Sequence, residues 1–153
     1  MTTPTLLGVI VLIGSGLTAG VLYAVALSVV PAFRALPAQR YVEIHKLIGR
    51  RFDHVMPPMV LTWTVLDVVL ALLTPGPVGR ALFLTAAVAG CGVAAVSQLG
   101  NVPINRRVKA LPAGPVPADW DDPRARWRVL NLIRTCLAVL ALTANAVALA
   151  LSS

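Results

Sequence analysis

The sequence predicts an all-α membrane protein, a bundle of four transmembrane helices with an interfacial amphipathic helix in its first cytoplasmic loop. Hydrophobic residues make up 58% of the 153 residues and charged residues only 12%, and the mean hydropathy is +0.82. A soluble domain of this length leaves much of its surface in water and usually has about twice this charged share. The composition therefore excludes a soluble enzyme and indicates a protein that spans the lipid bilayer.

The apolar residues fall into four runs, each long enough to cross a membrane, since a helical span needs about 20 residues. We place the predicted spans at about residues 5–30, 56–74, 80–100 and 129–151. Pro31 ends the first run, and the Thr-Pro-Gly-Pro breaker at residues 74–77 ends the second. The remaining residues form two polar loops and one tight turn, so residues 1–153 are expected to form a single domain.

The net charge of +7 comes from basic residues that gather in two loops. Residues 31–55 and 101–128 hold eleven of the 13 lysines and arginines, whereas the turn between spans two and three holds Arg80 alone. The positive-inside rule places both loops in the cytoplasm and both termini outside, in a multi-pass protein of the cell membrane. The charge thus sets orientation and contacts lipid headgroups, and we expect no binding to nucleic acid.

The first loop has the spacing of an amphipathic helix. One apolar stripe faces a charged side, a pattern typical of helices at the membrane interface, and it comprises Tyr41, Ile44, Ile48, Phe52 and Val55. His45 falls on the apolar stripe, as either a buried structural residue or a base that faces the mouth of the bundle. His54 falls on the opposite face. A copper or iron site formed by His45, His54 and Asp53 therefore requires a break in the helix near Gly49 or ligands from elsewhere.

Span four carries a polar stripe in an otherwise Leu/Ala/Val-rich sequence. At about 100° per residue, Trp127, Asn131, Arg134 and Asn145 share one face. Arg134 lies six residues beyond Arg128 and hence about 9 Å deeper. Two interpretations stay open: an anchor that reaches back to lipid phosphates, or a cation that faces an internal pocket.

Span two contains a single charge, Asp67, on the face that also carries Trp63. A carboxylate at this depth is either neutral or paired. Arg134 and Asp67 are the only charged residues well inside the spans. An ion pair between them is compatible with the sequence, although their expected depths differ.

Amide side chains gather where span three meets the cytoplasm. Ser97, Asn101 and Asn105 share one helical face if the helix continues, but Pro103 favours a break or a kink between them. Non-helical backbone at this depth survives only where protein or water satisfies it. We therefore expect a polar rim here, with helix capping by Asn101 as the alternative.

These segments together resemble the DUF1772 family of small integral membrane proteins, often called anthrone oxygenase-like. The similarity covers nearly the whole chain and is carried by residues 20–23 with Pro31, 51–57, 101–106 and 127–135. Its most specific elements are Asn-x-Pro-x-Asn, beginning at Asn101, and Trp-x6-Arg-Thr, beginning at Trp127. The resemblance implies four transmembrane helices. In characterised relatives it also implies oxidation of an anthrone to an anthraquinone by O2, without metal or flavin.

On this resemblance, His45 would be the base, with Asp53 or His54 as substitutes. The expected oxyanion-stabilising residues are Arg134, Asn131, Asn101 and Asn105, and the expected substrate-binding residues are Trp63, Trp120, Trp127 and Asp67. The implied partners are the lipid bilayer, a hydrophobic aromatic molecule and O2, with no cofactor.

Two other functions stay open. One is a metal-dependent membrane oxidase that uses copper or iron. The other is a non-enzymatic role, as a carrier of small molecules or an accessory membrane subunit. The Gly16-xxx-Gly20 pair in span one allows close helix approach, either inside the bundle or across a homo-oligomer interface.

Overall fold

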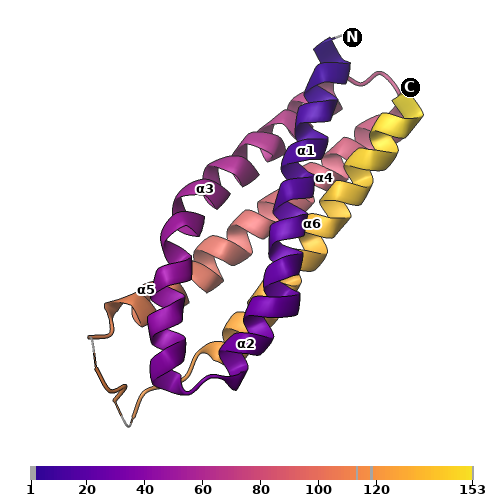
Figure 1. Ribbon diagram of the computed structural model, residues 1–153. Helices are drawn as coiled ribbons and strands as arrows, with labels where there is room; N and C mark the ends of the chain where they lie inside the picture. Colours follow the sequence, from indigo (N-terminus) through magenta and orange to yellow (C-terminus); the bar gives the residue numbers. More distant parts are fainter. Residues whose placement is uncertain (1–2, 113, 118, 153) are drawn as a thin grey trace.

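A computed structural model describes residues 3–112, 114–117 and 119–152, without the side chains of residues 3, 50, 51 and 152. Within this part of the chain the regular structure is entirely helical (Figure 1). The elements are α1 (Thr3–Ala24), the π-helical turn η1 (Val25–Val29), α2 (Val30–Ala35), α3 (Ala38–Leu73), α4 (Pro77–Val96), the π-helical turn η2 (Ser97–Asn101), α5 (Val102–Ala110) and α6 (Arg124–Ser152).

Four stretches of the described chain are long and apolar enough to cross a membrane, and they are Pro4–Ala35, Phe52–Leu73, Pro77–Ala110 and Arg124–Leu151. This confirms the predicted four-span architecture of a multi-pass membrane protein. Each of α1 and α4 packs against both α3 and α6, so the four form a ring around a shared axis. The connections between spans are short compared with the spans themselves, which makes neighbours in sequence antiparallel. Both termini therefore lie at one end of the bundle (Figure 1).

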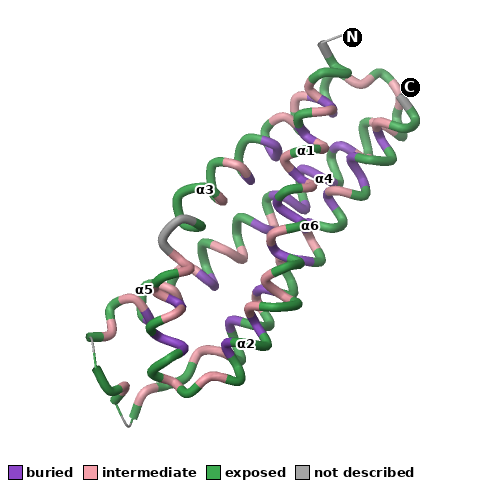
Figure 2. Tube along the Cα trace, viewed as in Figure 1, coloured by how far each residue is buried: buried purple, intermediate pink, exposed green. Residues whose placement is uncertain are grey.

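The interior of the bundle is built largely from small side chains. Along α6, Ala138, Ala141 and Ala148 are completely buried, and buried residues follow the inner side of each helix in Figure 2. Large apolar residues such as Leu72 and Val88 are instead more than 70% exposed. Lipid tails solvate such residues as well as protein does, so association in a membrane depends on close contact between small residues. This distribution, with small residues inside and large apolar residues outside, is what a helical bundle surrounded by lipid requires.

Two glycines give Trp63 of α3 its place in the middle of the bundle. A Cβ at Gly14 of α1 would lie 3.1 Å from the Trp63 Cβ, and one at Gly90 of α4 would lie 2.7 Å from the indole and overlap the Thr64 hydroxyl. Helices α1 and α4 therefore both approach α3 at this level. A Cβ at Gly20, by contrast, would meet no atom within 4 Å.

Spans one and three are longer than their sequences predict, because a proline does not end either helix. A proline ring collides with the carbonyl four residues earlier and lacks an N–H to donate. The π-helical turns η1 and η2 end just before Pro31 and Pro103. Their wider turns precede each proline, and the helix continues to Ala35 or Ala110. The predicted ends at residues 30 and 100 are thus corrected.

The amphipathic segment and span two form one continuous helix, α3, which runs through Pro57 and Pro58. Neither proline can donate a backbone hydrogen bond, which favours bending, and α3 changes direction in its middle (Figure 1). Tyr41 and His45 of the predicted apolar stripe are buried, whereas Val55 is 58% exposed. Whether this segment lies at a membrane interface stays a prediction.

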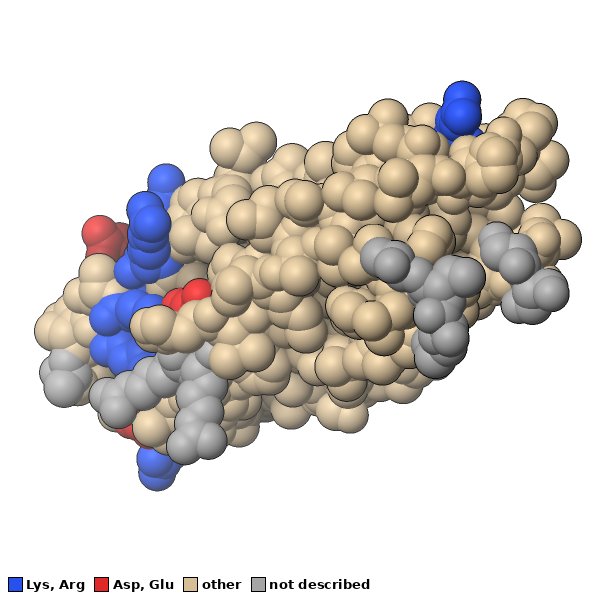
Figure 3. All heavy atoms as spheres, turned by 90° about the horizontal axis from the view of Figure 1, so that it is seen from above, with Lys and Arg blue, Asp and Glu red and all other residues tan. Residues whose placement is uncertain are grey.

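Basic side chains gather at the end of the bundle opposite the termini, and Figure 3 shows a long uncharged surface between the two ends. We call this the basic end; its described cations are Arg34, Arg40, Lys46, Arg106, Arg107, Lys109, Arg124, Arg126 and Arg128. The side chains of Arg50 and Arg51, counted in the predicted orientation, lie outside the described residues. The orientation itself stays a prediction.

Asp122 lies two residues before α6 and caps its first turn. Its Oδ1 accepts a hydrogen bond from the Arg124 N–H at 3.0 Å. The Arg124 guanidinium also donates to the carbonyl oxygens of Phe33 (2.8 Å) and Leu36 (2.7 Å). The basic end of α6 is therefore tied to the end of α2.

Gly90→Ala should lower the free energy of unfolding by about 1–3 kcal/mol, because overpacking at a close helix contact forces displacement of Trp63 and Thr64. Gly20→Ala is the matched control and should be neutral or stabilising by up to about 1 kcal/mol, since alanine is the better helix former. Thermal unfolding in detergent measures both. A Gly90→Ala protein that unfolds at or above the wild-type temperature would contradict this packing.

Candidate active site

A cavity of about 510 Å³ opens in the half of the bundle next to the basic end. Its volume lies within the range of small-molecule sites, about 300–1,000 Å³. Residues from each of the four membrane-spanning stretches line it, and most are apolar. The polar exceptions are His45, Asp53, Ser97, Gln98, Asn101, Asn105, Arg106, Lys109, Asn131 and Arg134.

Irregular helices surround this cavity. Both π-helical turns contribute to its wall, η1 through Val25 and Val29 and η2 through Ser97, Gln98 and Asn101. The α3 wall includes Pro57. Turns of this kind are frequent at functional sites, because they displace side chains from regular packing. Irregular helical turns and a proline thus coincide with the cavity.

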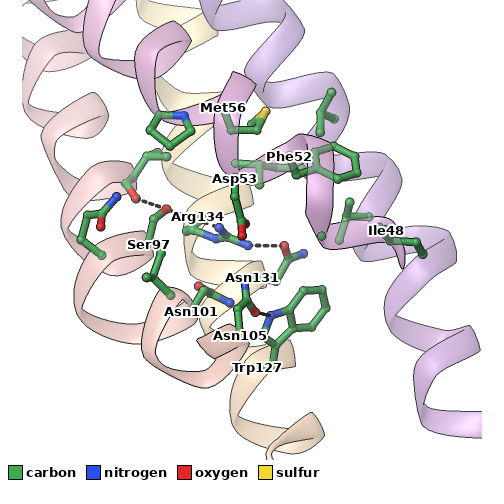
Figure 4. Close-up of a pocket in the computed structure, with 18 of the residues that line it drawn as sticks. Ile48, Phe52, Asp53, Met56, Ser97, Asn101, Asn105, Trp127, Asn131 and Arg134 are labelled. Carbon is green, nitrogen blue, oxygen red and sulfur yellow. Dashed lines mark hydrogen bonds between the residues drawn. The ribbon is translucent and has the colours of Figure 1, made fainter. Parts of the chain in front are cut away.

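Arg134 extends into the cavity from α6 (Figure 4). Its guanidinium donates to Asn131 Oδ1 at 2.9 Å and to Ser97 Oγ at 3.3 Å, while its Nε has no partner within the protein. The ion pairs found among the described residues involve other cations. Arg134 therefore faces the pocket, and its hydrogen-bond partners within the protein are neutral. A cation held only by neutral oxygens in this environment attracts an anionic ligand atom.

Two buried amides lie beside Arg134. Asn101 is 1% exposed and neither its Oδ1 nor its Nδ2 has a partner in the protein; Asn131 is fully buried and its Nδ2 has none. Asn101 has helical backbone angles and makes no capping hydrogen bond, so the capping alternative is not observed. Buried amides almost always have partners. These groups can therefore donate to an oxygen atom of a bound ligand.

His45 occupies an aromatic cage at the basic end of the cavity. Its ring centroid lies 5.3 Å from that of Tyr41, 5.5 Å from Phe33 and 6.0 Å from Trp127. Burial lowers the pKa of His45 to about 4, and the Lys109 cation lowers it further, whereas Asn105 and Asp53 act in the opposite direction. His45 is hence neutral near pH 7. Its Nδ1 has no partner in the protein, which suits a proton acceptor.

Trp127 forms a flat wall next to His45. Its Nε1–H donates to Asn105 Oδ1 at 3.0 Å, so Asn105 fixes the orientation of the indole (Figure 4). The three cavity residues of α6, Trp127, Asn131 and Arg134, span seven residues, or about 10 Å along the helix. The imidazole and the guanidinium thus occupy opposite ends of one apolar cavity.

Three residues predicted to bind substrate lie outside the cavity lining. Trp63 is buried in the packed half of the bundle and donates to Thr18 Oγ1 at 3.1 Å. Trp120 packs against Tyr41, with ring centroids 6.1 Å apart. Asp67 is fully buried beside Asn145. Of the predicted tryptophans, Trp127 alone contributes to the wall.

Asp67 and Arg134 do not pair in this structure. Asn145, the neighbour of Asp67, lies eleven residues beyond Arg134 on α6, which corresponds to about 16 Å along the helix. The two charges therefore belong to different levels of the bundle. Periodicity placed both on inward faces but could not fix their depths relative to each other.

The ligand set of the metal alternative is not assembled. Asp53 forms an ion pair with Lys109 across α3 and α5, and His54 lies on the exposed side of α3. The described residues contain no group of three or more His, Cys, Asp or Glu side chains that could hold a metal ion. Because α3 is unbroken near Gly49, His45 and His54 stay on opposite faces.

Sequence reasoning missed two aromatic residues of the cavity, Phe33 and Phe52. Phe33 follows Pro31, where the first span was expected to have ended, so its position depends on η1. Phe52 belonged to the predicted apolar stripe, but nothing in the stripe distinguishes a residue that faces lipid from one beside a cavity. Prolines near the basic end of three spans are the signal that could have indicated a widened region.

Comparison with curated proteins and with solved structures gives no match. A family model described as anthrone oxygenase matches residues 45–144. The matched segment begins at His45 and includes Asn101, Asn131 and Arg134, so it contains both ends of the cavity. This chain belongs to the anthrone oxygenase family.

Proposed function

We propose that the protein is a cofactor-independent oxygenase that converts the CH2 group of an electron-rich polycyclic ketone to a carbonyl. One O2 is consumed, one of its oxygen atoms enters the product, and the other leaves as water. This stoichiometry balances without an external reductant. The observation that supports the proposal is the convergence of a neutral imidazole and an unpaired guanidinium on one apolar cavity.

Proton removal starts the reaction. The acidic CH2 and the ketone oxygen of an anthrone lie on opposite sides of its central ring. The substrate therefore needs a base at one end of the site and hydrogen-bond donors at the other. His45 is neutral and offers Nδ1, and the rings of Phe33 and Trp127 beside it can orient a flat substrate.

The resulting enolate places negative charge on the ketone oxygen. Arg134 and the Nδ2 groups of Asn131 and Asn101 are the donors at that end of the cavity. Fixed donors in an apolar site stabilise developing charge more than water does, because they need no reorganisation. Asn105 fits a different role from the one expected, since its Oδ1 holds Trp127.

Oxygen then accepts electrons from the enolate itself. One electron passes to O2, and the carbon and oxygen radicals combine to a peroxide, which takes the proton from the His45 imidazolium. His45 next removes the second proton from the same carbon as the O–O bond breaks. The carbon becomes a carbonyl, and hydroxide leaves with a proton as water. An apolar wall keeps bulk water from protonating the enolate.

Arg134→Gln should lower kcat by about 10²–10³-fold, the loss typical of an oxyanion donor. His45→Ala should lower it by about 10²–10⁴-fold, as for a general base. Arg128→Gln, on an exposed position of the same helix, is the control and should retain activity. O2 uptake with an anthrone substrate in detergent measures all three. Wild-type rates in both the Arg134 and His45 variants would refute the assignment.

The rate of O2 uptake with an anthrone should be constant between about pH 6 and 8. It should fall on acidification, and the midpoint of this fall should lie near pH 4. Protonation blocks His45 as a base, and burial places the pKa of His45 at about 4, well below its ordinary value. Initial rates in vesicles across this range measure the midpoint, with thermal unfolding at each pH as the control for loss of fold. A midpoint near pH 6.5, the ordinary pKa of histidine, would show that the base is solvated.

A further inference from the structure

We propose that the cavity opens sideways into the bilayer, through a window between α3 and the α4–η2 helix, and that its ligand is a lipid-soluble, oxygenated aromatic molecule that enters from the membrane. The substrate class rests on the function proposed above, whereas the window rests on geometry alone.

The upper edge of the window is the contact between α3 and α4 in the middle of the bundle. Gly90 packs directly against Thr64 and Trp63, so closely that no side chain fits between the helices. The lower edge is the ion pair of Asp53 with Lys109, whose Nζ also donates to the Gly49 carbonyl at 3.4 Å. Both edges join α3 to the third span.

Between these edges, residues of both helices line the cavity and are also exposed. Pro57 and Leu61 lie on α3, and Ala94 and Gln98 lie on α4 and η2. Leu61 is 65% exposed although it is one turn from the buried Thr64. On α3 the window runs from Thr64 to Asp53, or about 16 Å at 1.5 Å per residue. That length admits a polycyclic ring system edge-on.

The window lies within the membrane-spanning stretches rather than at a water-filled mouth. Leu61 is nine residues inside the span that begins at Phe52, or about 13 Å along the helix. At the level of Leu61 the cavity-lining residues of α3 and α4 are uncharged, whereas Arg106, which also lines the cavity, lies near the lower edge. A ligand at this level therefore comes from the acyl chains of the lipid.

The amide side chain of Gln98 favours an oxygenated ligand over a lipid tail. Gln98 is an exposed residue at the rim of the window, where lipid supplies no hydrogen-bond partner and a polar group is costly. A ketone or hydroxyl group on an aromatic ligand can bind this amide during entry. Further inside, Asn101, Asn131 and Arg134 offer the next donors, so polar groups extend from the rim to the deep end.

Photolabelling tests the window without requiring turnover. A hydrophobic aryl diazirine is partitioned into phosphatidylcholine vesicles that contain the protein, and labelled residues are identified by mass spectrometry. We expect labels on the cavity residues Asn131 and Trp127. Leu61→Trp, which fills the window, should abolish these labels, and the smaller Leu61→Phe should reduce them. Leu72→Trp, on the lipid-facing side of the same helix, is the control and should leave them unchanged.

The proposal is overturned if cavity labelling persists in both Leu61 variants while they remain folded by thermal unfolding. It is also overturned if only a water-soluble diazirine labels the cavity. A wild-type protein that is labelled through the window but consumes no O2 with an anthrone would refute the oxygenase function and leave the window standing.

Discussion

A guanidinium inside the membrane-spanning part of the bundle, held only by neutral oxygens, is the constraint on which the rest of this structure depends. Arg134 has Ser97 and Asn131 as partners and no carboxylate, so the surrounding helices must supply amides and space instead of packing closely. An ion pair would have closed the site, because a neutralised cation has little affinity for an anion. The absence of a carboxylate partner therefore leaves both the positive charge and the cavity available to a ligand.

The two halves of the bundle differ in helix packing and in the residue types that produce it. In the half near the termini, glycine and alanine bring the helices into contact around Trp63, which provides rigidity where lipid offers no driving force for association. In the half near the basic end, prolines and π-helical turns accompany the cavity, and a second cluster of buried residues packs beyond it. Rigid packing on one side of the cavity allows a widened, polar interior on the other.

The fold could be predicted from the sequence because hydrophobic length alone identifies spans, and helical periodicity placed Asn101, Asn131 and Arg134 together on inward faces. Depth and side-to-side position could not be predicted. Helical periodicity placed Asp67 and Trp63 on an inward face of α3. It did not indicate that they lie at another depth than Arg134, because relative depth depends on how α3 and α6 are shifted along their axes. The continuation of two helices past Pro31 and Pro103 also required the π-helical turns, which have no distinct sequence pattern.

The central claim is that Arg134 stabilises an anionic oxygen of the ligand, and anaerobic absorption spectroscopy tests it most directly. Without O2 the proposed reaction stops at the enolate, whose extended conjugation gives it an absorption band distinct from that of the neutral ketone. At neutral pH, an anthrone mixed with excess wild-type protein in vesicles should show the enolate band, and Arg134→Gln should leave the substrate as the ketone. A ketone spectrum with the wild-type protein, at concentrations where binding is independently demonstrated, would contradict the account.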